Sequence, residues 1–219
     1  MPEAGEREGV ASRARRLFGR GDGAERIAAY SDGVFAIAMT LLVLDIVVPD
    51  GSTSAAQVLA EEWPSYVAFA LSFVIVALAW VGHHRRFRVV VGHDVGLLWL
   101  NLLLLLFVVS MPFPTSLISA FAPETAAVVV YAAAIALLQL GALAQWWYCW
   151  RRGLLAPSVD RGVFLVVVWD LLPVIAVFLV SVPIALLWGG EPAMWSWAAS
   201  IVLSPLVGVV ARRTLDARR

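Results

Sequence analysis

Six long apolar stretches dominate the sequence, and they constrain the fold more than any other feature. Each is close to the roughly 20 helical residues that cross about 30 Å of hydrocarbon. Hydrophobic residues make up 61% of the chain and charged residues 15%, whereas a soluble domain is about half apolar and about a quarter charged. The sequence therefore predicts an all-α membrane protein with six transmembrane helices. They are placed near residues 28–48, 64–84, 95–115, 125–149, 163–187 and 194–211.

The six stretches form one transmembrane domain, residues 28–211, between two basic ends. Residues 1–27 are predicted to be a cytoplasmic, amphipathic segment that rests on the anionic inner leaflet and does not bind nucleic acid. Residues 212–219 are predicted to be a cytoplasmic tail. The first stretch is too long and too polar at its start to be a cleaved signal peptide. Turn-forming residues separate several stretches, at 49–51, 122–124 and 189–192.

Arginine distribution predicts the orientation of the chain. All sixteen basic residues are arginines, and they precede the first stretch or follow the second, fourth and sixth. The three remaining loops carry acidic residues and no arginine. Because positive residues stay on the cytoplasmic side of a membrane, both termini are expected to be cytoplasmic.

Polar side chains on the first three stretches lie at a similar depth, near the expected cytoplasmic side. A charge within hydrocarbon is costly, so such residues are functional candidates that need partners. We expect a structural polar network that holds the first three helices together. Its members are Arg26, Ser31, Asp32, His83, His84 and Asn101, without a decision between the two adjacent histidines.

Two other interpretations of these polar residues stay open. His83, His84 and His93 are candidate metal ligands, but adjacent histidines on a helix diverge by about 100° and no acidic residue has ligand spacing. A proton relay from Asp32 to a histidine is chemically possible. We expect neither a resident metal nor a cofactor.

A second pattern in the first stretch is an apolar stripe with helical spacing. Asp32 points about 140° away from Ile37, at the centre of this stripe, so the two features face different neighbours. From the residues alone, ordinary helix packing or lipid contact is the favoured interpretation of the stripe. Its members are Tyr30, Gly33, Ile37, Leu41, Leu44 and Val48, with Thr40 at the border.

Motifs of known enzymes and of carbonyl-lined filters are missing from the sequence. It contains no Gly-Xaa-Ser-Xaa-Gly, no phosphate-binding glycine loop and no His-Glu-Xaa-Xaa-His. It also lacks a Thr-Val-Gly-Tyr-Gly filter. An enzyme is therefore not expected.

Residues 26–33, Arg-Ile-Ala-Ala-Tyr-Ser-Asp-Gly, resemble the RxxxFSD signature of the lysosomal potassium channel family, the transmembrane protein 175 family. Tyr30 stands where that family has phenylalanine. Further similarity lies in residues 34–46, in Trp80 to Arg85, and in Asn101 with the Pro112–Ser116 segment. The last three stretches carry no matching motif.

This resemblance implies a homotetrameric, potassium-selective channel in a bacterial cytoplasmic membrane, with potassium as the permeant ion. Four copies of the first helix would surround a central pore with an aliphatic constriction in place of a carbonyl filter. Carried over by position, Ile37 would form the constriction and Thr40 a hydroxyl layer, with Leu41 and Leu44 extending the lining. The polar network would then be a scaffold.

Two other functions remain open at this point. A proton-coupled secondary transporter would use Asp32 and a histidine of the second helix, although transporters tend to contain broken helices and internal repeats. A structural or signalling membrane protein without conduction is the other alternative.

Overall fold

The computed structural model describes residues 23–48, 51 and 54–216. Most of the predicted basic segment 1–27 and the last three residues of the predicted tail lie outside these ranges. The described regular structure is helical, apart from an isolated antiparallel bridge between Val90 and Leu155. In chain order the elements are α2 (Gly23–Leu41), η1 (Leu42–Asp45), α3 (Ala55–Glu61), α4 (Trp63–Phe87), α5 (Val95–Val109), α6 (Pro112–Phe121), α7 (Thr125–Arg152), α8 (Arg161–Trp188) and α9 (Gly190–Asp216).

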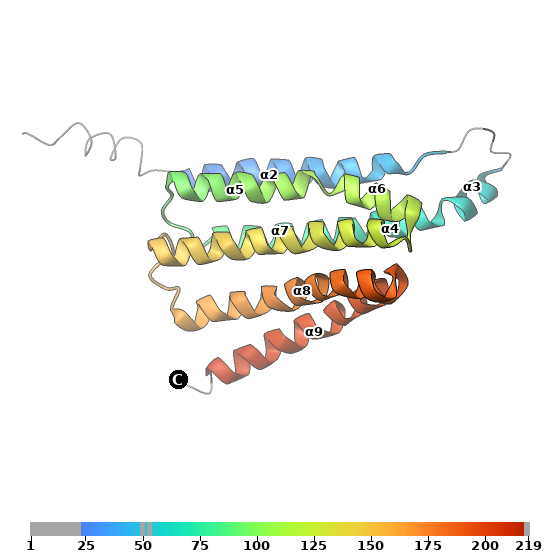
Figure 1. The fold of residues 1–219 in the computed structure, drawn as a ribbon. Helices are drawn as coiled ribbons and strands as arrows, with labels where there is room; N and C mark the ends of the chain where they lie inside the picture. Colours follow the sequence, from blue (N-terminus) through green and yellow to red (C-terminus); the bar gives the residue numbers. More distant parts are fainter. Residues whose placement is uncertain (1–22, 49–50, 52–53, 217–219) are drawn as a thin grey trace, which may run out of the picture.

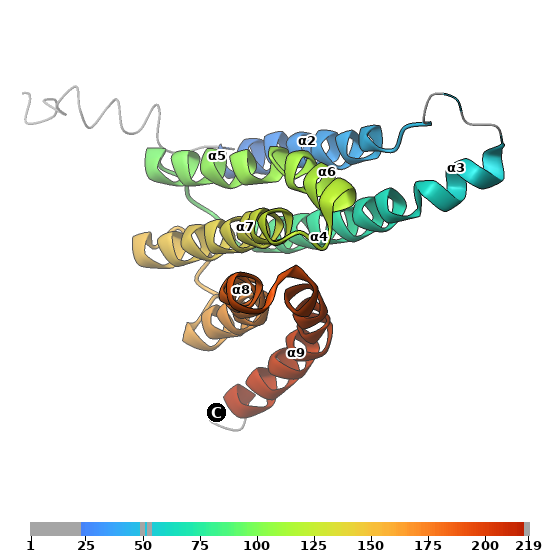
Figure 2. The same ribbon diagram turned by 45° about the vertical axis from the view of Figure 1, so that its right-hand side comes forward.

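The long helices lie side by side and alternate in direction (Figures 1 and 2). Helices α2 and α5 lie together, α4 and α7 pack next to them, and α8 and α9 pack on the far side of α7 (Figure 1). The starts of α2, α5 and α8 consequently lie at the same end as the ends of α4, α7 and α9. We call this end the arginine-rich end, because it carries Arg26, Arg85, Arg86, Arg88, Arg151, Arg152 and Arg161.

Five segments of the described chain are long and apolar enough to cross a membrane. They are Gly23–Leu44, Trp63–Phe87, Val95–Phe121, Thr125–Arg152 and Arg161–Trp188. Helix α9 is a further long helix in the position of the sixth predicted span. The prediction of an all-α membrane protein is confirmed, with five to six candidate spans.

Local sequence explains where several helices begin and end. The side chains of Asp94 and Asp160 accept hydrogen bonds from backbone N–H groups three residues later, at the starts of α5 and α8. Such N-caps satisfy donors that have no partner within the helix. Gly153 ends α7 with a φ of +64°, a left-handed conformation that glycine adopts without steric cost.

The third predicted span, near 95–115, corresponds to the candidate span Val95–Phe121, which consists of two helices and not one. Ser110 and Met111 separate α5 from α6, which continues to Phe121 and lies at an angle to α5 (Figure 2). Pro112 begins α6, where its missing N–H costs no hydrogen bond. Backbone hydrogen bonds continue across the break, because the Met111 N–H donates to the Val108 carbonyl at 3.2 Å and the Phe113 N–H donates to the Ser110 carbonyl at 3.2 Å.

One loop contains a helix that was not predicted, and one predicted turn is shorter than expected. The loop after the first span contains α3, capped by Ser54, whose hydroxyl accepts from the Gln57 N–H. The predicted turn 189–192 is reduced to Gly189, with a φ of +96°, and α9 begins at the next residue. A short capped helix and a one-residue turn leave no apolar signal from which to predict them.

The buried core lies between α2, α4, α5, α6, α7, α8 and the start of α9. Small residues on α7 let neighbouring helices approach closely, as is common where helices pack within membranes. The largest fully buried apolar side chains are Phe35, Leu42, Leu97, Leu104, Met111, Tyr131, Ile135 and Leu138.

Candidate pore-lining face and its polar support

Helix α2 has one buried face and one exposed aliphatic face. Ser31, Phe35 and Ala38 are buried against the rest of the chain. On the other side, Ile37 is 59% exposed, and Leu44, in the η1 turn that continues α2, is 66% exposed. The predicted pore-lining residues Ile37, Thr40, Leu41 and Leu44 are all exposed, and we call them the α2 stripe. A single chain therefore leaves this apolar surface to be covered by lipid or by other copies.

Thr40 adds a polar group to the α2 stripe. Its Oγ1 donates to the carbonyl of Ile37 at 2.8 Å. A threonine hydroxyl has one hydrogen and two acceptor lone pairs. Since the hydrogen is used within the helix, the oxygen is left as an acceptor that can face a cation.

A buried polar cluster joins the opposite face of α2 to three other helices, and Asn101 on α5 is its centre. Its Nδ2 donates to Ser31 Oγ at 3.0 Å, and its Oδ1 accepts from Gln145 Nε2 on α7 at 3.0 Å. The same oxygen lies 3.1 Å from His83 Nε2 on α4, which must therefore carry the hydrogen. The Ser31 hydroxyl donates its hydrogen bond to the Ile27 carbonyl at 2.8 Å. We call Ser31, His83, Asn101 and Gln145 the asparagine cluster.

Packing holds His83 in this orientation. Its ring stacks on Phe87 with centroids 4.4 Å apart and lies 5.5 Å from the ring of Phe35. The side chain is fully buried. The asparagine cluster is thus enclosed by aromatic rings and is separated from the α2 stripe by the helix itself.

Asp32 belongs to a second, more exposed contact between α2 and α4. Its Oδ1 accepts a hydrogen bond from Trp80 Nε1 at 2.8 Å, and its Oδ2 lies 4.0 Å from His84 Nδ1. The latter contact is an ion pair only when the histidine is protonated. Both side chains border a cavity of about 750 Å³ at the arginine-rich end, together with Glu25 and Arg88.

The residues of the predicted polar network are therefore divided between two sets of contacts. His83 lies with Ser31 and Asn101, whereas His84 lies beside Asp32. Arg26 is exposed, and the described part of the chain offers it neither a hydrogen bond nor an ion pair. His93 lies apart from these contacts, and the described residues contain no group of three side chains placed to hold a metal ion.

Sequence reasoning missed two partners in these contacts. Gln145 is a lone amide in the apolar fourth stretch, which is the signal that could have identified it. Trp80 lies four residues before His84, so both point to the same side of α4 and reach Asp32. In the sequence, Trp80 stands out only as part of the Trp80–Arg85 segment that resembles the family.

A third polar contact, also missed, lies nearer the other end of the bundle. Thr115 Oγ1 on α6 lies 2.8 Å from the Met111 carbonyl oxygen and 2.8 Å from Ser72 Oγ on α4, and Ser72 Oγ lies 3.0 Å from the hydroxyl of Tyr131 on α7. All three side chains are buried. We call them the hydroxyl cluster, and it ties α6 to the bundle just after the break at Met111.

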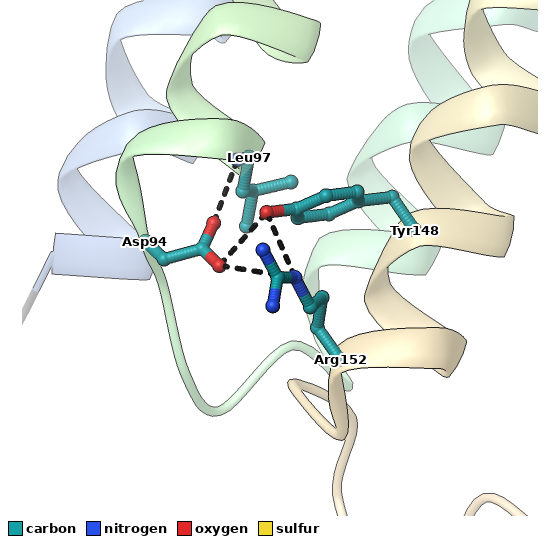
Figure 3. A network of polar contacts seen from close by, with 4 residues as sticks. All are labelled: Asp94, Leu97, Tyr148 and Arg152. Carbon is teal, nitrogen blue, oxygen red and sulfur yellow. Dashed lines mark hydrogen bonds and ion pairs between the residues drawn. The ribbon is translucent and has the colours of Figure 1, made fainter.

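Figure 3 shows a fourth set of contacts, at the arginine-rich end. Asp94, which caps α5, accepts a hydrogen bond from the Tyr148 hydroxyl of α7 at 2.9 Å. Arg152 Nε donates to the same hydroxyl at 3.3 Å and lies 3.9 Å from the Asp94 carboxylate. These contacts hold the start of α5 against the end of α7.

Known proteins resemble the chain in sequence and in fold. The profile of the family described as endosomal/lysosomal potassium channel TMEM175 matches residues 26–112. A potassium channel of Streptomyces collinus is 42% identical over 142 residues, which make up 62% of this chain and 69% of that protein. A potassium channel of Chamaesiphon minutus is 46% identical over 100 residues, 44% of this chain and 49% of that protein.

A solved structure extends the comparison beyond the matched segment. The crystal structure of a lysosomal potassium-selective channel TMEM175 homologue from Chamaesiphon minutus superposes with a TM-score of 0.68 and 28% identity. The alignment covers 87% of this chain and 99% of that one. The resemblance predicted from residues 26–33 is confirmed: the chain belongs to the TMEM175 family of potassium channels and is not an enzyme.

Proposed function

We propose that the chain is one subunit of a homotetrameric, potassium-selective channel of a bacterial cytoplasmic membrane, in which α2 lines the central pore. The observation that carries this proposal is the exposed aliphatic α2 stripe, on a helix whose other face is held by buried polar contacts. The bacterial relatives named above are potassium channels, which favours the same function here.

The proposed constriction is a ring of four Ile37 side chains. A narrow apolar passage loses its water readily, so such a ring can close the pore by dewetting. An ion that crosses the ring has to shed part of its hydration shell. Potassium holds water less tightly than sodium, and the ring therefore favours potassium.

Thr40 and the two leucines complete the proposed lining. Thr40 lies almost one turn beyond Ile37, and its free acceptor lone pairs can replace part of the water that a cation loses at the ring. Leu41 and Leu44 extend the aliphatic surface away from the arginine-rich end.

The polar contacts behind α2 are assigned a positioning role. Ser31, His83 and Asn101 point into the subunit, on the far side of α2 from the stripe, and Asp32 lies on its flank. Neither set reaches the proposed pore axis. Arg26 has no partner among the described residues of its own chain, so we assign it to contacts that form when copies assemble.

Reconstitution tests this function. Purified protein in proteoliposomes and planar bilayers should give ohmic single-channel currents, and the reversal potential in bi-ionic solutions should favour potassium over sodium. Native mass spectrometry should give four chains. Saturable flux driven by a pH gradient would support the transporter that uses Asp32 and His84, and absence of flux would support a non-conducting role.

A further inference from the structure

In the proposed ring of four subunits, each subunit also contacts its neighbours through surfaces beside the α2 stripe. Within one chain, α4 packs on one flank of α2 through Asp32 and Trp80, and α5 packs on the other through Ser31 and Asn101. In a closed cyclic ring each interface joins two different faces of the subunit. The flank beside α5 and α6 must therefore meet the flank beside α4 of the next copy.

An apolar groove marks the first of these two faces. It has a volume of about 770 Å³ and lies between the end of α2, the break between α5 and α6, and α7. Leu41 and Leu44 belong to both the groove and the α2 stripe, so the groove is continuous with the proposed pore surface. Its other main walls are Val109, Phe113, Val130 and Leu137.

Depth identifies which part of α4 can meet this groove. Helices α2 and α4 are antiparallel, and Asp32 is level with the turn between Trp80 and His84. Leu41 lies nine residues beyond Asp32, and Phe73 lies nine residues before the midpoint of that turn. Because both helices rise equally per residue, Phe73 and Leu41 have the same depth. Rotation about a pore axis along the helices preserves this depth in the next copy.

The side of α4 around Phe73 is shaped for close helix contact. Phe73 is 41% exposed and apolar. Ala70 and Ala77, three residues before it and four after it, lie on the same side of the helix. Small residues let another helix approach closely within a membrane, and packing rather than hydrophobicity drives association there.

We propose that Phe73 of each copy inserts into the groove of the next copy, between Leu44 and Phe113. This inference rests on the tetramer proposed above, and it specifies that the α4 face of one subunit meets the groove of the next. It makes the neighbouring subunit part of the wall behind Leu41 and Leu44, so the outer half of the pore lining is supported only in the assembled ring. A lipid acyl chain is the alternative occupant of the groove.

Disulfide trapping between two differently tagged, co-expressed chains tests the proposal. Cys149 is the sole cysteine and is buried, so Cys149→Ala gives a cysteine-free parent. One chain then carries Phe73→Cys and the other Phe113→Cys. The control pair combines Phe113→Cys with Leu71→Cys, since Leu71 has the same 41% exposure and nearly the same depth but faces the other side of α4. Disulfides form only when the two Cα atoms come within about 7 Å.

Oxidation should link the Phe73→Cys and Phe113→Cys chains into a dimer that carries both tags. The control pair with Leu71→Cys should give no more of this cross-linked dimer than the cysteine-free parent does. A disulfide through the Leu71→Cys pair would overturn the proposal and leave the tetramer intact. The absence of a disulfide in both pairs, with native mass spectrometry still finding four chains, would do the same. If native mass spectrometry of the cysteine-free parent finds no tetramer, that result would instead refute the proposed function itself.

Discussion

Two adjacent histidines near the end of α4 have different environments. His83 is fully buried between Phe35 and Phe87 and bonds to Asn101, whereas the side chain of His84 is half exposed, 4.0 Å from Asp32. Neighbouring positions on a helix diverge by about 100°, so one faces the interior and the other the cavity at the arginine-rich end. Similar side chains at adjacent positions thus make unequal contributions to stability.

His83→Ala should lower the thermal unfolding midpoint of the detergent-solubilised protein much more than His84→Ala. The first change removes a partner of the buried Asn101 oxygen, which costs roughly 1–3 kcal/mol, and it also leaves a cavity. The second removes an exposed pair worth about 0–1 kcal/mol. Equal shifts for both variants, measured by intrinsic tryptophan fluorescence, would mean that the asparagine cluster does not hold the helices together.

Ile37→Asn should raise single-channel conductance and reduce discrimination between potassium and sodium. Four amides at the proposed constriction hold water and replace part of an ion's hydration shell, so the dewetting barrier falls. Leu106→Asn is the matched control. Leu106 is 55% exposed against 59% for Ile37, and it lies at a similar depth because Ser31 and Asn101 place α2 and α5 in register.

The measurement is the reversal potential in bi-ionic solutions, with oligomeric state checked for both variants. Leu106→Asn should leave selectivity unchanged. If Ile37→Asn lowered stability and left selectivity as in the parent, Ile37 would face lipid or another helix, and the pore proposed here would lose its constriction.

At the scale of elements, the hydroxyl cluster joins α6 to α4 and α7 just after the break between α5 and α6. Thr115→Val keeps the shape of the side chain and removes the hydroxyl that bonds to Ser72, so the buried Ser72 loses one partner and keeps only Tyr131. Hydrogen exchange in residues 112–121 should become faster as α6 detaches. Ser116→Ala, which removes only a bond to the Pro112 carbonyl within the same helix, should leave the exchange of α6 nearly unchanged.

The contrast between α5–α6 and the other helices explains how much of the fold the sequence could predict. Apolar length was enough to place α2, α4, α7 and α8, because a span needs little besides about 20 apolar residues. It did not reveal the break at Ser110, since the apolar pattern continues through it. Prolines at 112 and 114 were a local sign, but the hydroxyl cluster that holds α6 comes from three helices distant in sequence.

In the candidate site, too, features of a single helix could be predicted from the sequence, whereas contacts between helices could not. Position on one helix predicted the α2 stripe, since helical spacing alone puts Ile37, Leu41 and Leu44 on one side. The partners of the polar residues depended on which side each neighbouring helix presents. For that reason Gln145 was missed and the choice between His83 and His84 stayed open. The groove between α2, the α5–α6 break and α7 depends on how distant helices pack, so the sequence carries no signal for it.

At the scale of the whole molecule, charge and architecture agree. The alternating directions of α2, α4, α5, α7, α8 and α9 bring the arginines of four separate segments to one end of the bundle (Figure 1). Acidic residues such as Glu62 and Glu124 lie at the other end. Arginines are retained on the cytoplasmic side during insertion, so a bundle with this asymmetry has a strongly preferred orientation.

Both termini should therefore be cytoplasmic, and the segment that contains α3 should be on the outer side. A fluorescent reporter that folds only in the cytoplasm should be bright after Arg219, and alkaline phosphatase inserted before Ala55 should be active outside. Replacing Arg85, Arg86 and Arg88 together by alanine should weaken this preference, because it removes the positive charge at the end of α4. An outer C-terminus in the parent chain would require an odd number of spans, and α9 would then have to lie outside the membrane.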